Sequence, residues 1–136
     1  MSKTTDTPNK IPSNLALHQQ SRVLDITFEH DEVFKLPCEY LRVHSPSAEV
    51  RGHGPGQEVL QVGKEQVNII AIEPIGHYAV RLVFDDSHNS GLYSWDYLYE
   101  LGTQRHDKWQ AYLQRLADAG HQRESQPNDQ HLNRAK

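Results

Sequence analysis

One histidine of this sequence stands in a polar turn, directly before one of the most aromatic segments of the chain. Residues 85–101 read DDSHNSGLYSWDYLYEL, and the histidine is His88. A histidine in such a turn can ligate a metal, act as a general base, contribute to a binding surface or simply hold the turn. Cys38, His44 and His53 add further thiol and imidazole groups. These are ligand types that suit zinc, but they lack the short paired spacing of structural zinc modules.

Other reactive groups of the sequence do not form a recognisable catalytic pattern. The glycine-rich run RGHGPGQ, residues 51–57, contains a proline, does not clearly begin a helix and lacks the lysine and Ser/Thr of a phosphate-binding loop. Several serines could serve as nucleophiles, but there is no G-x-S-x-G elbow, and a serine beside Pro46 or Gly91 is typical of a turn or a cap. Asp85 and Asp86 are typical of a solvated turn. We therefore predict a protein that is not an enzyme.

Composition limits the class of protein. With 136 residues and 36% hydrophobic content, the chain has room for one domain with a modest core. Its single cysteine and the absence of a recognisable leader predict a reducing cytoplasm. No apolar run approaches the roughly 20 residues that span a bilayer, which predicts no membrane partner. The net charge of -4 argues against nucleic acid, because nonspecific binding to phosphates depends on an excess of lysine and arginine.

The sequence pattern predicts an α+β domain over residues 21–119, between mobile polar tails at residues 1–20 and 120–136. VLDITF and VFKL are separated by HDE and predict a β-hairpin, whereas CEYLRV suits either a helical turn or a strand. Residues 45–63 predict a long Gly/Pro-rich loop, in which only residues 58–62 look like a strand. Residues 66–72 and 77–84 predict two strands joined by EPIG, the second with Tyr78, Val80, Leu82 and Phe84 on one face.

Two helices are expected at the C-terminal end of the domain. Ser94 predicts the cap of a first helix over residues 95–101, which ends at Gly102. Thr103 predicts the cap of a second helix that ends at Gly120. That helix carries an apolar stripe of four residues: Trp109, Tyr112, Leu113 and Leu116. Strands first and helices last predict helices packed against a largely antiparallel sheet.

The runs SPSAEVRGHG and HNSGLYSWDYL together resemble a family of small bacterial proteins that has been called a domain of unknown function. That family is related to the N-terminal domain of gamma-butyrobetaine hydroxylase and trimethyllysine hydroxylase. In those hydroxylases the domain looks like a zinc-binding accessory unit, in which three cysteines follow an L-R pair and a histidine from a later turn is the fourth ligand. By position, Leu41 and Arg42 match the pair and His88 matches the fourth ligand. The three cysteine positions fall at Ser45, Ser47 and Val50.

The resemblance therefore implies a zinc site that has lost its thiolates. A hydroxyl is a poor zinc ligand and a valine is none, so the thiolate-rich site cannot form. We expect His88 to bond to the loop of residues 45–49, with no cofactor. The alternative is a rebuilt zinc site that uses His88 with His44, His53 or Cys38. Hydroxylase activity is not expected, because the resemblance is to the accessory domain and the iron chemistry of the hydroxylases belongs to their separate catalytic domain.

The leading functional hypothesis is a non-catalytic accessory module that binds a protein partner, and the alternative is a small metal- or ligand-binding protein centred on His88. Related domains are appended to ApbC/Mrp-type ATPases that carry iron–sulfur clusters, so the resemblance implies such a carrier, or a metalloenzyme, as the partner. Trp95 is expected to pack into the core rather than on the surface. The expected contact surface comprises Arg42, Ser45, Ser47, Glu49, Arg51, His53, Gly54 and His88.

Overall fold

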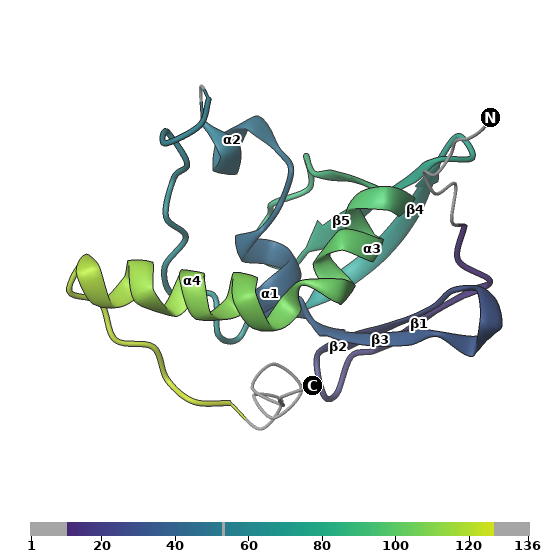
Figure 1. Cartoon of the computed structure of the whole chain (residues 1–136), viewed down its shortest axis with the longest axis horizontal. Coiled ribbons are helices and arrows are strands. Elements are labelled where there is room, and N and C mark those ends of the chain that lie inside the picture. Colours follow the sequence, from purple (N-terminus) through teal and green to yellow (C-terminus); the bar gives the residue numbers. More distant parts are fainter. Residues whose placement is uncertain (1–10, 53, 127–136) are drawn as a thin grey trace.

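The computed structural model describes residues 11–52 and 54–126 (Figure 1). Their regular structure consists of two three-stranded antiparallel sheets and four α-helices, so the predicted α+β class is confirmed. The sequence pattern predicted one sheet, whereas the described strands form two. Among the described residues, no helix is long and apolar enough to cross a membrane.

The first sheet has the order β1 (Asn14–His18), β2 (Val23–Thr27) and β3 (Val33–Pro37), with the short 3-10 turn η2 (Glu29–Asp31) between the last two. The predicted hairpin is confirmed by the β2–β3 pairing. Strand β1 lies inside the expected N-terminal tail, so that boundary was wrong for residues 14–18. The expectation for residues 1–10 lies outside the described residues.

The second sheet has the order β4 (Ile69–Ile75), β5 (Ala79–Phe84) and β6 (Leu92–Ser94). Strand β4 continues through Pro74, which an edge strand tolerates because one side of its backbone needs no partner. Because β4 extends to Ile75, most of the predicted EPIG turn belongs to the strand. The alternation of β5 is confirmed for the buried Val80, Leu82 and Phe84, whereas Tyr78 precedes the strand and is 61% exposed. The predicted strand at residues 58–62 is wrong: the described residues between α2 and β4 form no helix or strand.

The helices are α1 (Cys38–Val43), α2 (Ala48–Arg51), α3 (Trp95–Thr103) and α4 (Arg105–Asp118). Helix α2 interrupts the expected loop of residues 45–63. Ser94 caps α3 as predicted, because its hydroxyl accepts a hydrogen bond from the Tyr97 amide. The predicted Thr103 cap is wrong: the hydroxyl of Thr103 donates to the Glu100 carbonyl, and α4 begins after Gln104 with no side-chain cap.

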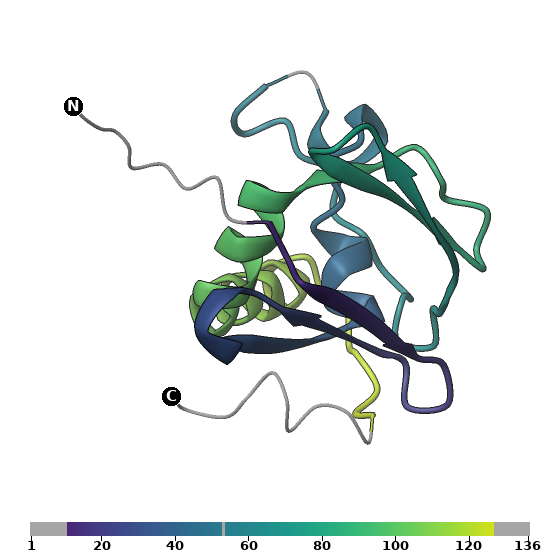
Figure 2. The same ribbon diagram turned by 90° about the vertical axis from the view of Figure 1, so that its right-hand side faces the viewer.

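Helix α1 lies near the middle of the molecule, between the two sheets, and α3 and α4 cover one side (Figures 1 and 2). All six residues of α1 are buried. Two tyrosine hydroxyls fix its position: Tyr40 donates to the Leu101 carbonyl at 2.7 Å, and Tyr93 donates to the Leu41 carbonyl at 2.6 Å. The core also takes in Trp109 and Tyr112 of the predicted α4 stripe. Trp95 is partly buried against this core and donates to the His77 carbonyl.

The chain beyond α4 does not leave the domain at once. Arg123 lies in the expected C-terminal tail, yet its Nε donates to the buried Glu39 carboxylate at 2.7 Å. Its guanidinium also lies 4.9 Å from the centre of the Trp109 ring, a cation–π contact. The domain therefore extends to at least this residue, past the predicted boundary at residue 119. The tail expected at residues 127–136 lies outside the described residues.

Candidate functional site: a buried histidine cluster

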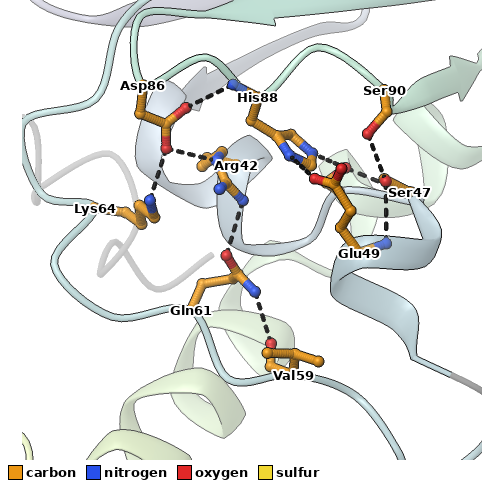
Figure 3. A network of polar contacts seen from close by, with 10 residues as sticks. Arg42, Ser47, Glu49, Val59, Gln61, Lys64, Asp86, His88 and Ser90 are labelled. Carbon is orange, nitrogen blue, oxygen red and sulfur yellow. Dashed lines mark hydrogen bonds and ion pairs between the residues drawn. The ribbon is translucent and has the colours of Figure 1, made fainter.

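His88 lies between two segments of the chain and bonds with both of its ring nitrogens (Figure 3). It is 4% exposed. Nε2 lies 2.8 Å from Oγ of Ser45, and Nδ1 lies 3.0 Å from Oε1 of Glu49. The expectation that this histidine bonds to the loop of residues 45–49 is confirmed. The imidazole joins the β5–β6 turn to Ser45, in the segment between α1 and α2, and to Glu49 of α2.

The bonding partners determine which ring nitrogen carries the proton. A carboxylate only accepts, so the Nδ1–H of His88 donates to Glu49, and the Ser45 hydroxyl donates to Nε2. Oγ of Ser45 in turn accepts from the Ser47 amide at 3.2 Å. Burial lowers the pKa of His88, the positive charge of Arg42 lowers it further, and Glu49 acts in the opposite direction. The histidine is therefore neutral at pH 7.

The turn that carries His88 is formed by its own side chains and backbone. Oδ1 of Asp86 accepts from the His88 amide at 3.2 Å, an Asx-turn arrangement typical of aspartate two residues earlier. The His88 carbonyl accepts from the Phe84 amide, which closes the end of β5. On the facing segment, the Ser47 hydroxyl caps α2 by accepting from the Glu49 amide, and it also bonds to the Ser90 hydroxyl at 2.7 Å.

Gly91 lets the turn and the facing segment approach closely. A Cβ atom at this position would lie 2.5 Å from Oγ of Ser45 and 3.3 Å from Cδ of Pro46. The backbone of Gly91 is not in the left-handed region, so the requirement is for space and not for an unusual conformation. Gly91 therefore allows the close approach of the turn to Ser45, to which His88 is hydrogen-bonded.

Beside the histidine, Arg42 forms a second part of the network (Figure 3). Its Nε donates to the Asp86 carboxylate at 2.9 Å and its Nη1 donates to Gln61 at 3.0 Å. Lys64 donates to the same carboxylate at 2.7 Å. Burial raises the pKa of Asp86, but the Lys64 bond and the Arg42 charge outweigh it and leave the pKa below its usual value. Arg42 is 6% exposed, so it is an internal ion-pair residue and not part of the contact surface expected from the sequence.

By its distances, the set Ser45–His88–Glu49 has the arrangement of a nucleophile, a base and an orienting carboxylate. The burial of its members is the reverse of what catalysis requires. Ser45 is 1% exposed and its oxygen is enclosed by the Ser47 amide and Gly91, whereas the Glu49 side chain is 71% exposed. A substrate would reach the carboxylate and not the hydroxyl. This geometry supports a structural connection, not acyl transfer.

The residues of the expected rebuilt metal site do not converge in the part of the chain that the structure describes. Nδ1 of His44 bonds to the Tyr40 carbonyl, and burial lowers its pKa to about 4. Sγ of Cys38 lies 3.7 Å from Oδ1 of Asn68, and burial raises the pKa of this thiol to about 12. His53 lies outside the described residues. Over residues 11–52 and 54–126, no three His, Cys, Asp or Glu side chains are grouped to hold a metal ion.

The expected contact surface is therefore divided. Four of its residues are buried and support the loop from inside: Arg42, Ser45, Ser47 and His88. Glu49 and Arg51 remain exposed, and Gly54 is partly exposed. Sequence reasoning missed Asp86, Gln61 and Lys64. For Asp86 the D-x-H spacing of an Asx turn was the available signal, but the pairing with Arg42, 44 residues earlier, had none.

In the described part of the chain, two three-stranded sheets, four helices and an imidazole that joins a turn to a loop define a small α+β domain with a buried polar cluster. The chain belongs to the gamma-butyrobetaine hydroxylase-like, N-terminal family, whose model matches residues 15–99. That range begins within β1, contains the His88 cluster and the other five strands of the described residues, and ends within α3.

Solved structures support this assignment. Two solution structures determined by NMR share 50% and 48% sequence identity with the chain, with TM-scores of 0.73 and 0.75. The alignments cover 85% and 92% of this chain, and 94% and 93% of those chains. A crystal structure of a protein of unknown function from Acidithiobacillus ferrooxidans, in the DUF971 family, is 34% identical with a TM-score of 0.57, over 67% of this chain and 91% of that one. No functionally curated protein matches the chain.

Proposed function

We propose that the protein is a non-catalytic interaction module, and that Arg51 and the segment after α2 form its contact surface for a protein partner. The observation that carries the proposal is a segment without helix or strand that is fastened internally and yet exposes apolar side chains. Val59 is 50% exposed and Val62 is 40% exposed. Binding residues are often carried by ordered surface loops, and the two exposed valines of this loop supply apolar area that a partner can cover.

Hydrogen bonds hold this segment at Val59 and at Gln61, which lies between the two exposed valines. The Val59 amide donates to the Val50 carbonyl at 2.8 Å, and the Tyr112 hydroxyl donates to the Gln61 carbonyl at 2.7 Å. The Gln61 side chain also accepts from Arg42. A loop that is ordered before binding loses less conformational entropy when a partner docks. The His88 cluster contributes to the same order, because it fixes α2, from which the segment leaves.

The partner that we propose is an iron–sulfur carrier ATPase of the ApbC/Mrp type, with a metalloenzyme as the second choice. Its support is the family resemblance, because related domains are appended to such ATPases. Arg51 would donate to a carboxylate of the partner, and Val59 would enter an apolar contact. The domain itself would supply a surface and no reaction, and it would work from a reducing compartment.

The test is the binding of the purified ATPase, measured by calorimetry against four single variants. Arg51→Glu and Val59→Ser are expected to weaken binding by about tenfold each, the effect of losing roughly 1.4 kcal/mol of contact energy. Val33→Ser and Lys35→Glu are the matched controls, because these residues are similarly exposed but lie on β3, in the first sheet. Equal weakening by the control variants would refute the contact surface. An absence of binding to the ATPase, with binding to a metalloenzyme, would move the proposal to the second partner.

A further inference from the structure

A cavity of about 220 Å³ lies beside the His88 cluster, and all four helices or the segments next to them contribute to its wall. Val43 and Val50 give it an apolar part. Arg51, Lys108 and Arg115 bring three cationic side chains to the same cavity, against the single carboxylate of Glu58. The chain as a whole carries a net charge of -4, so this concentration of positive charge is a local reversal.

The fold places each of these cations from a fixed element. Lys108 and Arg115 are seven residues apart on α4, two helical turns, and therefore lie on one face of the helix. Arg51 is the last residue of α2, and its guanidinium carbon lies 5.9 Å from the centre of the Tyr97 ring. The ring is itself held, because the Tyr97 hydroxyl donates to the His44 carbonyl at 2.6 Å.

Internal neutralisation of these charges is incomplete. Lys108 pairs with Glu100 at 3.2 Å. Over the described residues, Arg51 and Arg115 make no ion pair with a carboxylate. Two guanidinium groups at one cavity are well suited to an oxyanion, since their planar donors can bind phosphate or carboxylate oxygens in pairs.

We propose that this cavity binds a small molecule that carries a phosphate or carboxylate group. Arg51 and Arg115 donate to the anionic group, and Lys108 adds to the positive potential. Glu58 accepts a hydrogen bond from a hydroxyl or amino group of the same ligand. The apolar wall at Val43 and Val50 contacts its carbon skeleton. This site shares Arg51 and Glu58 with the proposed partner surface but goes beyond it, because Lys108 and Arg115 belong to α4 and Val59 is not part of the cavity wall.

The probes are inorganic phosphate and succinate, each titrated into the full chain at constant ionic strength while amide and arginine Nε–H resonances are recorded. We expect saturable shifts at Arg51, Tyr97 and Arg115 with one of the probes, and the tighter probe identifies the anionic group. Arg115→Gln should weaken that binding by about tenfold or more, since a charge-assisted hydrogen bond is lost. Arg105→Gln, on the same helix but outside the cavity, is the matched control and should bind normally.

Three outcomes would overturn the proposal: shifts that do not saturate with either probe, shifts distributed over basic residues far from the cavity, or equal affinity of wild type and Arg115→Gln. Both variants change an α4 side chain to glutamine, a good helix former, and their amide spectra report whether the fold is retained. Val59→Ser should leave the binding of the probe unchanged, which separates this site from the partner surface.

Discussion

Replacing His88 with alanine tests whether the buried cluster is a structural connection or the remainder of a working metal site. The change removes the bond to Ser45 at 2.8 Å and the bond to Glu49 at 3.0 Å. A typical buried hydrogen bond contributes about 0.5–1.5 kcal/mol, and the Glu49 bond belongs at the low end because its carboxylate is exposed. Loss of the packed imidazole adds a cavity, so the free energy of unfolding should fall by about 2–4 kcal/mol.

For a domain of this size, about 4 °C is lost from the melting temperature for each kcal/mol, so the transition should move down by roughly 8–16 °C. Differential scanning calorimetry with a chelator and with added zinc measures the shift in each condition. A structural histidine gives the same loss in both. His106→Ala, an exposed histidine on α4, is the control and should change little. A loss of less than 1 kcal/mol would refute the structural role, and a loss seen only with zinc would establish a metal site.

Three further predictions concern the same region. The pKa of His44 is about 4 in the folded protein and 6.5 for the free group, so the unfolded chain binds more protons between these pH values. The free energy of unfolding should therefore fall by about 2 kcal/mol from pH 7 to pH 5. Urea titrations of His44→Gln should show a smaller fall. Gly91→Ala should cost about 1–3 kcal/mol by forcing its Cβ against Ser45, and the cost should shrink in a Ser45→Ala background; an unchanged cost would locate the clash elsewhere. A triple variant supplies three thiols by Ser45→Cys, Ser47→Cys and Val50→Cys. It should bind one zinc ion per chain, with His88 as the fourth ligand and Glu49 bonded to the other ring nitrogen. Cobalt substitution followed by absorption spectroscopy tests this.

Local patterns in the sequence predicted the elements that depend on local chemistry. The alternation of VLDITF gave the hairpin, and Ser94 marked the start of α3. Strand β1 was missed because its short apolar run LAL lies between polar residues at both ends, and its place as a strand depends on pairing with β2. Residues 58–62 look like a short strand in the sequence, but the Val59 amide bonds to the Val50 carbonyl and the Gln61 carbonyl to the Tyr112 hydroxyl instead of to a sheet.

The candidate site was predicted only in part, because its contacts join residues that are far apart in the sequence. The contact between His88 and the loop of residues 45–49 followed from the family resemblance, which carries information about distant contacts that spacing does not. The resemblance did not indicate which side chains are inside. Arg42 looked like a surface donor in the sequence, and only its ion pair with Asp86 shows that the charge is used internally.

The energetic scale of the cluster bears on what it does. A structural zinc site contributes about 10–16 kcal/mol in small domains that cannot fold without the metal, whereas the bonds around His88 contribute a few kcal/mol at most. The fold must therefore be held by its core, in which Ile26, Leu41 and Trp109 are 0% exposed. Typical domains have 5–15 kcal/mol of stability, so losing the cluster should loosen the α2 segment and leave the domain folded. The His88 cluster thus serves to position α2 and the segment that follows it. Its loss should weaken partner binding through Val59 even at temperatures where the fold persists.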